Sequence, residues 1–345
     1  MGVMGGWYAA ELRKELMERS RAWAKGRLHV ESYGTSPVIV FAPEHEDAEA
    51  PEPSRHGNFF DAAYMAIAAR PEWMRRFEKI HTQGRALPKA ESGRRWRELD
   101  SSMSSDALLM NCFAGFGAAE SSRLKVGLGV DVDSLPDFGW RARVPLASGH
   151  FDRTEVDMRW GNLLVEAKLT ESDFQTRSAK IVEGYRDFDA VFDRELLPRV
   201  DLRAARRRTA IEFAEEYTQE WEEPAADAAV ALEFQAEIVA RARATEPVEA
   251  GYAGYQLIRN VLAAYASGCS FCVLHDARRP DLREQWFSVM AAVKNAEMRT
   301  RCKVMTWQEL AALVPEELQE FLDIKYGIVR AGRVASAVGE TAELE

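Results

Sequence analysis

The chain has 345 residues, of which 47% are hydrophobic, and a formal net charge of −10. This composition suits a folded protein with one large core or two modest ones, and the negative charge argues against a surface that is basic throughout. With no run of about 18 apolar residues and no signal-peptide pattern at the start, we expect no membrane span and a cytoplasmic location.

The first 100 residues are expected to form a mainly helical N-terminal region. Helical patterns cover 7–25 and 58–80, and a short apolar run at 38–41 predicts a strand. The acidic segment 43–53 contains several Pro and Ala residues and predicts a loop.

Basic residues gather beside aromatic ones in three places, each of which could contact phosphate groups. The alternative interpretation of each cluster is an ordinary solvated helix face. The clusters are Arg70, Arg75, Arg76 and Lys79 near Trp73 and Phe77; Arg94, Arg95 and Arg97 around Trp96; and Arg203, Arg206, Arg207 and Arg208.

Residues 101–330 are expected to form the core of the protein. Serines at 101–105 offer N-cap candidates for a helix that runs through Phe113. The apolar run 126–132 is expected to be the first strand of the core.

The segment 154–170 predicts a β-hairpin. Val156, Met158 and Trp160 alternate with polar residues, and a returning strand runs over 163–169. Gly161-Asn162 fits a two-residue turn, and this turn fixes the register of the two strands.

In that register Asp157 lies opposite Glu166, and Glu155 lies opposite Lys168. Opposed residues have Cβ atoms about 5 Å apart, and like charges so placed destabilise the pair unless a positive charge lies between them. A divalent cation would remove that cost, and Lys168 removes part of it without a metal. Two carboxylates and a lysine therefore predict a site for metal-dependent phosphodiester cleavage.

After the hairpin, 171–250 is expected to be a mostly helical insertion, and 254–268 an amphipathic helix that ends at Gly268. Apolar strands are expected over 270–275 and 302–307. A final helix is expected over 315–326, and the small, acidic residues of the tail, 331–345, predict disorder.

The Asp, then Glu-x-Lys on the returning strand, followed by a helix and an apolar strand, resembles the PD-(D/E)xK nuclease superfamily, in a poorly characterised prokaryotic branch. The resemblance covers about residues 101–327. The family's proline is missing, because Glu155-Val156-Asp157 stands where Pro-Asp would be. The resemblance implies an α/β fold with a restriction-endonuclease-like core of αβββαβ order, in which helices flank a mixed central sheet.

The resemblance also implies roles for individual residues. Asp157 and Glu166, helped by the Ala167 carbonyl, would bind Mg²⁺ or Mn²⁺, and Lys168 would orient the attacking water. Gln256, on the helix after the hairpin, would position water or phosphate, with Arg259 beside it as a secondary candidate.

Two acidic residues complete the candidate set. Glu155 would serve as a carboxylate behind the first metal ligands or for a second metal, and Glu120 would be an acidic residue of the first helix. The alternative for the polar residues of the helix after the hairpin is an ordinary surface position.

The expected function is a divalent-metal-dependent nuclease that acts on DNA, with RNA not excluded as a substrate. A homodimer or a larger complex is compatible with the sequence. One alternative is a catalytically inactive module of the same fold that binds nucleic acid or a partner protein. Another is an unrelated enzyme in which the hairpin is purely structural and Asp157 and Glu166 lie on different faces.

Cysteine is the remaining candidate for metal chemistry. The pair Cys269 and Cys272 forms one C-x-x-C at the edge of an expected buried strand, where Cys behaves as a small hydrophobic residue. A four-cysteine cluster with Cys112 and Cys302 is the less favoured interpretation, because the spacing does not fit well.

Overall fold

The computed structural model describes residues 2–33, 37–45, 54–81, 95–115, 121–130, 133–203 and 250–329. The expected disordered tail and most of the expected helical insertion lie outside these residues. Within the described residues, no helix is both long and apolar enough to cross a membrane.

The N-terminal region combines helices with short strand pairs. Its long first helix packs against the C-terminal helix α14 (Glu316–Tyr326). A proline at position 71 and a 3-10 turn break the helix expected over 58–80 into pieces. The elements are α1 (Gly2–Trp23), β1 (His29–Glu31), β2 (Ile39–Phe41), β3 (Pro43–Glu44), β4 (Arg55–His56), α2 (Asp61–Ala68), α3 (Pro71–Met74), η1 (Arg75–Glu78) and η3 (Glu98–Asp100).

A five-stranded mixed sheet forms the centre of the protein, in the order β14-β13-β9-β8-β5. Strands β5, β8 and β9 are antiparallel neighbours, whereas β13 runs parallel to both β9 and β14. The bounds are β5 (Asp137–Arg141), β8 (Glu155–Trp160), β9 (Leu163–Ala167), β13 (Ser270–His275) and β14 (Cys302–Thr306).

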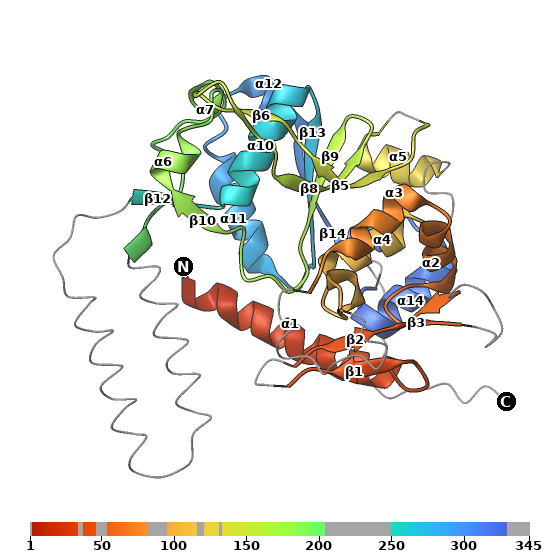
Figure 1. Ribbon diagram of the computed structural model, residues 1–345. Coiled ribbons are helices and arrows are strands. Elements are labelled where there is room, and N and C mark those ends of the chain that lie inside the picture. The colour runs from red at the N-terminus through yellow and green to blue at the C-terminus, as the bar shows by residue number, and fades with distance from the viewer. Residues whose placement is uncertain are drawn as a thin grey trace, which may run out of the picture.

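Helices cover both faces of this sheet, as Figure 1 shows. One hydrophobic core lies between the sheet and the N-terminal region with α4, α13 and α14, and a second lies between the sheet and α10, α11 and α12. The helices are α4 (Ser105–Phe113), α5 (Ser122–Leu128), α10 (Tyr255–Ser267), α11 (Pro280–Met290), α12 (Ala296–Arg301) and α13 (Trp307–Ala311).

Smaller elements surround the second core. The described part of the expected insertion contains strands as well as helices, because β10 and β11 both pair with β12 in a three-stranded sheet. These elements are β6 (Val144–Pro145), β7 (Phe151–Asp152), β10 (Thr176–Ser178), α6 (Ala179–Val182), α7 (Phe188–Val191), β11 (Arg199–Asp201) and β12 (Ala250–Ala253).

The strand expected over 126–132 is wrong, because α5 runs through Leu128 and the described residues up to 130 contain no strand there. The Ser121 hydroxyl caps the helix by accepting a hydrogen bond from the Leu124 backbone N–H, and Gly129 ends it with a φ of 64°. Val126, which a core strand would bury, is 82% exposed. The first core strand is β5 instead.

The other expected core elements are present. The helix that ends at Phe113 is α4, and the hairpin is β8 and β9, with Trp160 opposite Leu163 and Met158 opposite Val165 as expected. The helix over 254–268 is α10, and the strand after it is β13.

Strands β5 and β8 change the face that they bury near their middle. Phe138 and Met158 belong to the first core, whereas Val156 belongs to the second and Trp140 packs against it. In a regular strand, residues two apart share a face. The irregularity is at Gly139, whose φ is 68°, and at Asp157 on the neighbouring strand.

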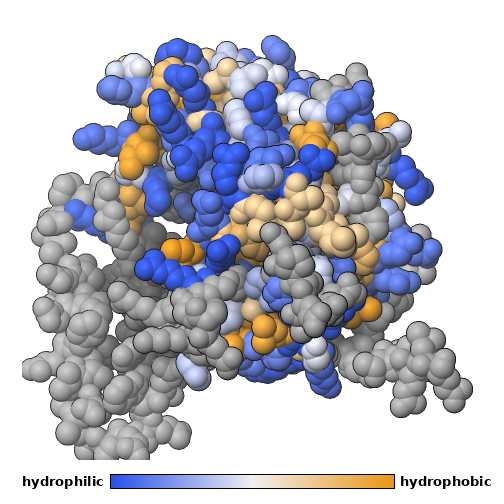
Figure 2. Space-filling view, turned by 45° about the vertical axis from the view of Figure 1, so that its right-hand side comes forward, coloured by the Kyte–Doolittle hydropathy of each residue, from blue (hydrophilic) through white to orange (hydrophobic). Residues whose placement is uncertain are grey.

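The face of the molecule in Figure 2 is mainly hydrophilic. The exposed large hydrophobic side chains lie on different elements, for example Trp7 on α1, Val126 on α5 and Phe287 on α11. Single exposed apolar side chains of this kind are normal on a protein surface.

Candidate active site

Asp157 lies where the backbone pairing of β8 with β9 stops, one residue beyond Met158. There the Asp157 Oδ2 atom accepts a hydrogen bond of 2.8 Å from the Ala167 backbone N–H. Burial and the negative charges of Glu166 and Asp106 raise the pKa of Asp157 well above its ordinary value. The carboxylate is therefore costly to ionise unless a cation compensates for its charge.

Glu166 is held from two sides by charge-assisted hydrogen bonds. Its Oε1 atom lies 2.9 Å from the Lys168 Nζ atom, and its Oε2 atom accepts a hydrogen bond of 2.7 Å from Asn260 Nδ2 on α10. Its side chain is nearly fully buried. Each carboxylate oxygen can accept more than one hydrogen bond, so Glu166 keeps acceptor capacity for a metal ion.

Lys168 is a buried ammonium group. Burial lowers the pKa of Lys168, but the negative charges of Glu166, Glu171 and Asp157 outweigh burial and raise it above its ordinary value. The lysine therefore stays protonated, and it can donate hydrogen bonds but cannot act as a base. Its backbone is fixed by bonds to the Leu274 carbonyl, at 2.8 Å, and from the Trp307 indole N–H, at 2.9 Å.

Asp106, in the first turn of α4, is an acidic residue that sequence reasoning missed. It is buried beside Asp157, and its Oδ2 atom accepts a hydrogen bond of 2.6 Å from Arg76 Nη2. It lies on the first core helix, whereas Glu120, the acidic residue expected for that helix, lies outside the described residues. The available signal was its place two residues after Ser104, which caps α4.

Gln256 and Arg259 lie on α10, as expected, one turn or less before Asn260. The Gln256 Oε1 atom is buried and has no hydrogen-bond partner among the residues that the structure describes. Arg259 is buried, and its Nη2 atom donates two hydrogen bonds. One goes to the Asn260 Oδ1 atom at 2.5 Å, and the other goes to the Glu155 backbone carbonyl at 2.8 Å. Arg259 therefore orients Asn260, which sequence reasoning missed although it lies four residues from Gln256 on the same helix face.

Glu155 does not lie opposite Lys168. Its backbone pairs with Arg141 of β5, and the pairing of β8 with β9 does not extend beyond Met158. Its side chain accepts a hydrogen bond from Arg76. The hairpin register holds near the turn and fails beyond it, because the strands separate where the Asp157 carboxylate binds the Ala167 backbone.

The donor set at this position fits a hard divalent cation. Among the described residues, no group of three or more His, Cys, Asp and Glu side chains is arranged as a metal cluster. Asp157 and Glu166 supply carboxylate oxygens, which Mg²⁺ and Mn²⁺ prefer, and they commonly share coordination with water and phosphate. The raised pKa of Asp157 and the unpartnered Gln256 oxygen are both features that a bound cation with its water would explain.

The cysteines take no part in this site. Cys112, Cys269 and Cys272 are buried free thiols, and Cys272 and Cys269 belong to different cores. Burial raises the pKa of the Cys272 thiol to about 12. They behave as small hydrophobic residues, as the sequence indicated for the C-x-x-C pair.

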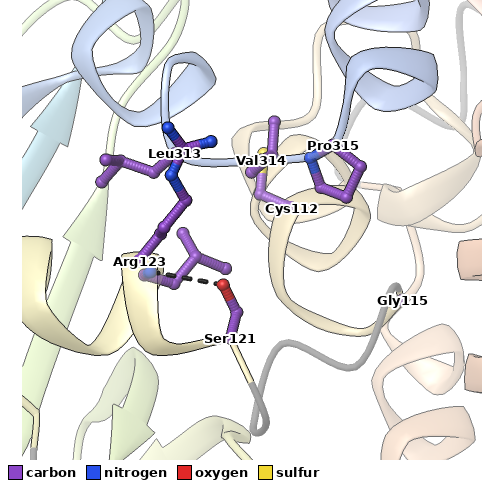
Figure 3. A pocket seen from close by; sticks show the side chains of 8 residues that line it. Cys112, Gly115, Ser121, Arg123, Leu313, Val314 and Pro315 are labelled. Carbon is purple, nitrogen blue, oxygen red and sulfur yellow. Dashed lines mark hydrogen bonds between the residues drawn. The ribbon is translucent and has the colours of Figure 1, made fainter.

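A pocket of about 160 Å³ lies away from these carboxylates, between α4, α5 and the segment before α14 (Figure 3). Its lining contains no Asp or Glu. The Ser121 hydroxyl at its edge is the cap of α5. The pocket therefore lacks the carboxylates that would hold a metal ion for phosphodiester chemistry, although Arg123 lines it.

Comparison with known protein families gives a match. A family model described as "Restriction Endonuclease associating with ARP" matches residues 20–327, which is most of the chain. Neither a curated protein nor a solved structure matches.

Proposed function

The chain belongs to the family of restriction endonucleases associating with ARP, and we propose that it is a nuclease that hydrolyses phosphodiester bonds in DNA with the help of Mg²⁺ or Mn²⁺. Family membership implies the restriction-endonuclease-like fold and a phosphodiester hydrolase. The observation that carries the metal-dependent mechanism is the group formed by half-buried Asp157 on β8, buried Glu166 near the end of β9 and a buried, protonated Lys168 just after it.

In this proposal Asp157 and Glu166 hold the cation, together with the Ala167 carbonyl. A divalent cation at this position polarises a phosphate oxygen and lowers the pKa of bound water. Asn260 keeps Glu166 in position through its hydrogen bond of 2.7 Å, and Arg259 keeps Asn260 in position.

Lys168 stabilises negative charge as it develops on the phosphate. Its ammonium group is already desolvated and fixed by Glu166, so it needs no reorganisation during the reaction. Gln256 orients the attacking water or a phosphate oxygen with its amide, whose Oε1 atom has no partner among the described residues. Glu155 does not contact the reacting groups and acts only by accepting a hydrogen bond from Arg76.

The test is cleavage of supercoiled, linear and single-stranded DNA with Mg²⁺ or Mn²⁺, with Lys168→Ala compared against the parent protein. The matched control is Lys294→Ala, which removes an exposed lysine outside the site. We expect metal-dependent cleavage by the parent and the control, and its loss in Lys168→Ala. Cleavage at the parent rate by a folded Lys168→Ala protein would contradict the assignment.

An RNA substrate in the same assay tests the preference for DNA. If no substrate is cut, the change in melting temperature of the parent protein with Mn²⁺ distinguishes a site that needs a partner from an inactive module. Thermal stabilisation by Mn²⁺ would indicate a functional site that needs a partner, such as the ARP named in the family's description. Its absence would favour the inactive module that binds nucleic acid or protein.

A further inference from the structure

A second buried cation, Arg76, lies beside the candidate metal ligands. Its side chain is 7% exposed, and it binds two carboxylates at once, Asp106 through Nη2 at 2.6 Å and Glu155 through Nη1. Burial lowers the pKa of Arg76, but the negative charges of Asp106, Glu155 and Asp157 outweigh burial and raise it. Two carboxylates, one from α4 and one from β8, therefore bind one guanidinium group, and Asp157 of β8 adds a third negative charge that acts on it.

Arg76 belongs to the N-terminal region and not to the sheet, and neighbouring aromatic residues that pack against the protein hold it in position. Trp73 donates its indole N–H to the Pro136 carbonyl at 2.9 Å and packs edge-on against Phe138 of β5. Phe77, next to Arg76, is buried among aromatic side chains. The 3-10 turn η1 is thus fixed on both sides of Arg76, so the guanidinium position is set before any ligand binds.

The sheet makes room for the guanidinium group at Gly139. A Cβ atom added at this residue would lie 2.8 Å from Arg76 Nη1 and 3.3 Å from Glu155 Cδ. The φ of 68° is also one that residues with a side chain rarely adopt. The backbone of β5 is therefore open at the place where Arg76 lies against β8.

The acidic groups divide between two buried cations. Asp106 and Glu155 bind Arg76, Glu166 binds Lys168, and Asp157 lies between the two sets, within the electrostatic reach of both. In sites with two metal ions, the ions lie about 3.5–4 Å apart and carboxylates bind both of them. Here Asp106 and Glu155 already bind a positive charge, and the charge of Asp157 acts on the same group.

We propose that Arg76 takes the place of a second metal ion, so that the site binds one divalent cation, between Asp157 and Glu166. The inference rests on the proposed function, and it assigns Arg76 a positioning role in it. A guanidinium group neutralises carboxylates through directed hydrogen bonds, and its fixed charge repels a second divalent ion. The N-terminal region thereby completes the charge balance of a site that is built on the sheet.

The experiment counts Mn²⁺ ions. Calorimetric titration with Mn²⁺ gives the number bound per chain, and electron paramagnetic resonance reports whether two bound ions are spin-coupled. The variants are Arg76→Met, which keeps the aliphatic stem, Arg76→Lys, which keeps the positive charge, and Arg76→Met with Asp106→Asn, which removes a ligand of the new site.

We expect one ion for the parent protein and for Arg76→Lys, two coupled ions for Arg76→Met, and one ion for the double variant. Two ions in the parent protein, or a single ion in folded Arg76→Met, would overturn the inference and leave the nuclease proposal standing. No bound ion in the parent protein would overturn both.

Arg76→Met can unfold in the absence of metal, because it leaves three carboxylates without their cation. Mn²⁺ should then restore folding, since a ligand that binds the native state stabilises it. The dependence of unfolding free energy on the logarithm of Mn²⁺ concentration should be twice as steep as in the parent protein. Failure of Arg76→Met to fold in saturating Mn²⁺, while Arg76→Lys folds, would refute the exchange of arginine for a metal ion.

Discussion

Replacing Asp157 with Asn should make the metal-free protein more stable and the metal-bound protein less so. Asn has nearly the same shape, and its oxygen can still accept the hydrogen bond that the Ala167 backbone N–H donates to Asp157 over 2.8 Å. The substitution therefore removes the charge and keeps the packing. Because burial, Glu166 and Asp106 all disfavour the Asp157 carboxylate, its removal should stabilise the fold when no metal is present.

The pH dependence follows from the same shift. The raised pKa means that folded Asp157 holds its proton at pH values where the unfolded chain, with an ordinary pKa of about 3.9, has released it. The contribution of Asp157 to the stability of the metal-free parent protein should thus be greatest below that value and be lost as pH rises through the raised pKa. Asp157→Asn should lack this component of the decrease.

Metal binding should reverse the order of stability. At a free Mn²⁺ concentration of 100 times the dissociation constant, one bound ion stabilises the parent protein by about 2.7 kcal/mol. For a protein of this size, that corresponds to a melting temperature higher by roughly 5 °C. Asp157→Asn should show almost no rise, since it loses one of the two carboxylates that hold the ion.

The assay is thermal melting at pH 6 and pH 8, with EDTA or with Mn²⁺, followed by DNA cleavage under the same conditions. Asp133→Asn is the control, because Asp133 is fully exposed and lies outside the site. An equal Mn²⁺ response in Asp157→Asn and the parent would place the metal elsewhere. A lower stability of metal-free Asp157→Asn at pH 8 would refute the electrostatic reasoning.

Two further predictions concern polar groups that the fold buries. Gln256→Leu should keep or raise the melting temperature, because it removes a buried oxygen without a partner among the described residues. The same variant should lower the cleavage rate by about 10- to 100-fold, because it loses a hydrogen bond between the amide and a charged group. An unchanged cleavage rate would exclude Gln256 from the reaction. Lys325 is fully buried, donates to the Asn58 carbonyl at 2.8 Å, and has a pKa that burial and then Arg27 lower well below its ordinary value. The unfolded chain holds that proton up to a pKa of about 10.4, so the stability of the parent protein should rise between pH 7 and pH 10. Denaturant unfolding should show a smaller rise in stability for Lys325→Met. Equal rises in the two proteins would show that Lys325 is charged in the fold.

Local sequence was sufficient for the hairpin and for the helix and strand that follow it. Gly161-Asn162 fixes a tight turn, and the alternation along β8 and β9 leaves a single register near that turn. These short-range patterns also brought Asp157, Glu166 and Lys168 into one candidate site. They failed at 126–132, where the cap at Ser121 and the left-handed Gly129 outweigh an apolar run and produce α5.

Tertiary structure alone decided which other residues surround those three. Arg76 reads in the sequence as one member of a basic cluster, but the packing of Trp73 and Phe77 buries it against Asp106 and Glu155. Asn260 likewise becomes a partner of Glu166 only when α10 packs on the sheet. The physical reason is that periodicity and turn chemistry act between neighbours in the chain, whereas the charge balance of a buried site depends on side chains that only folding brings within hydrogen-bond distance.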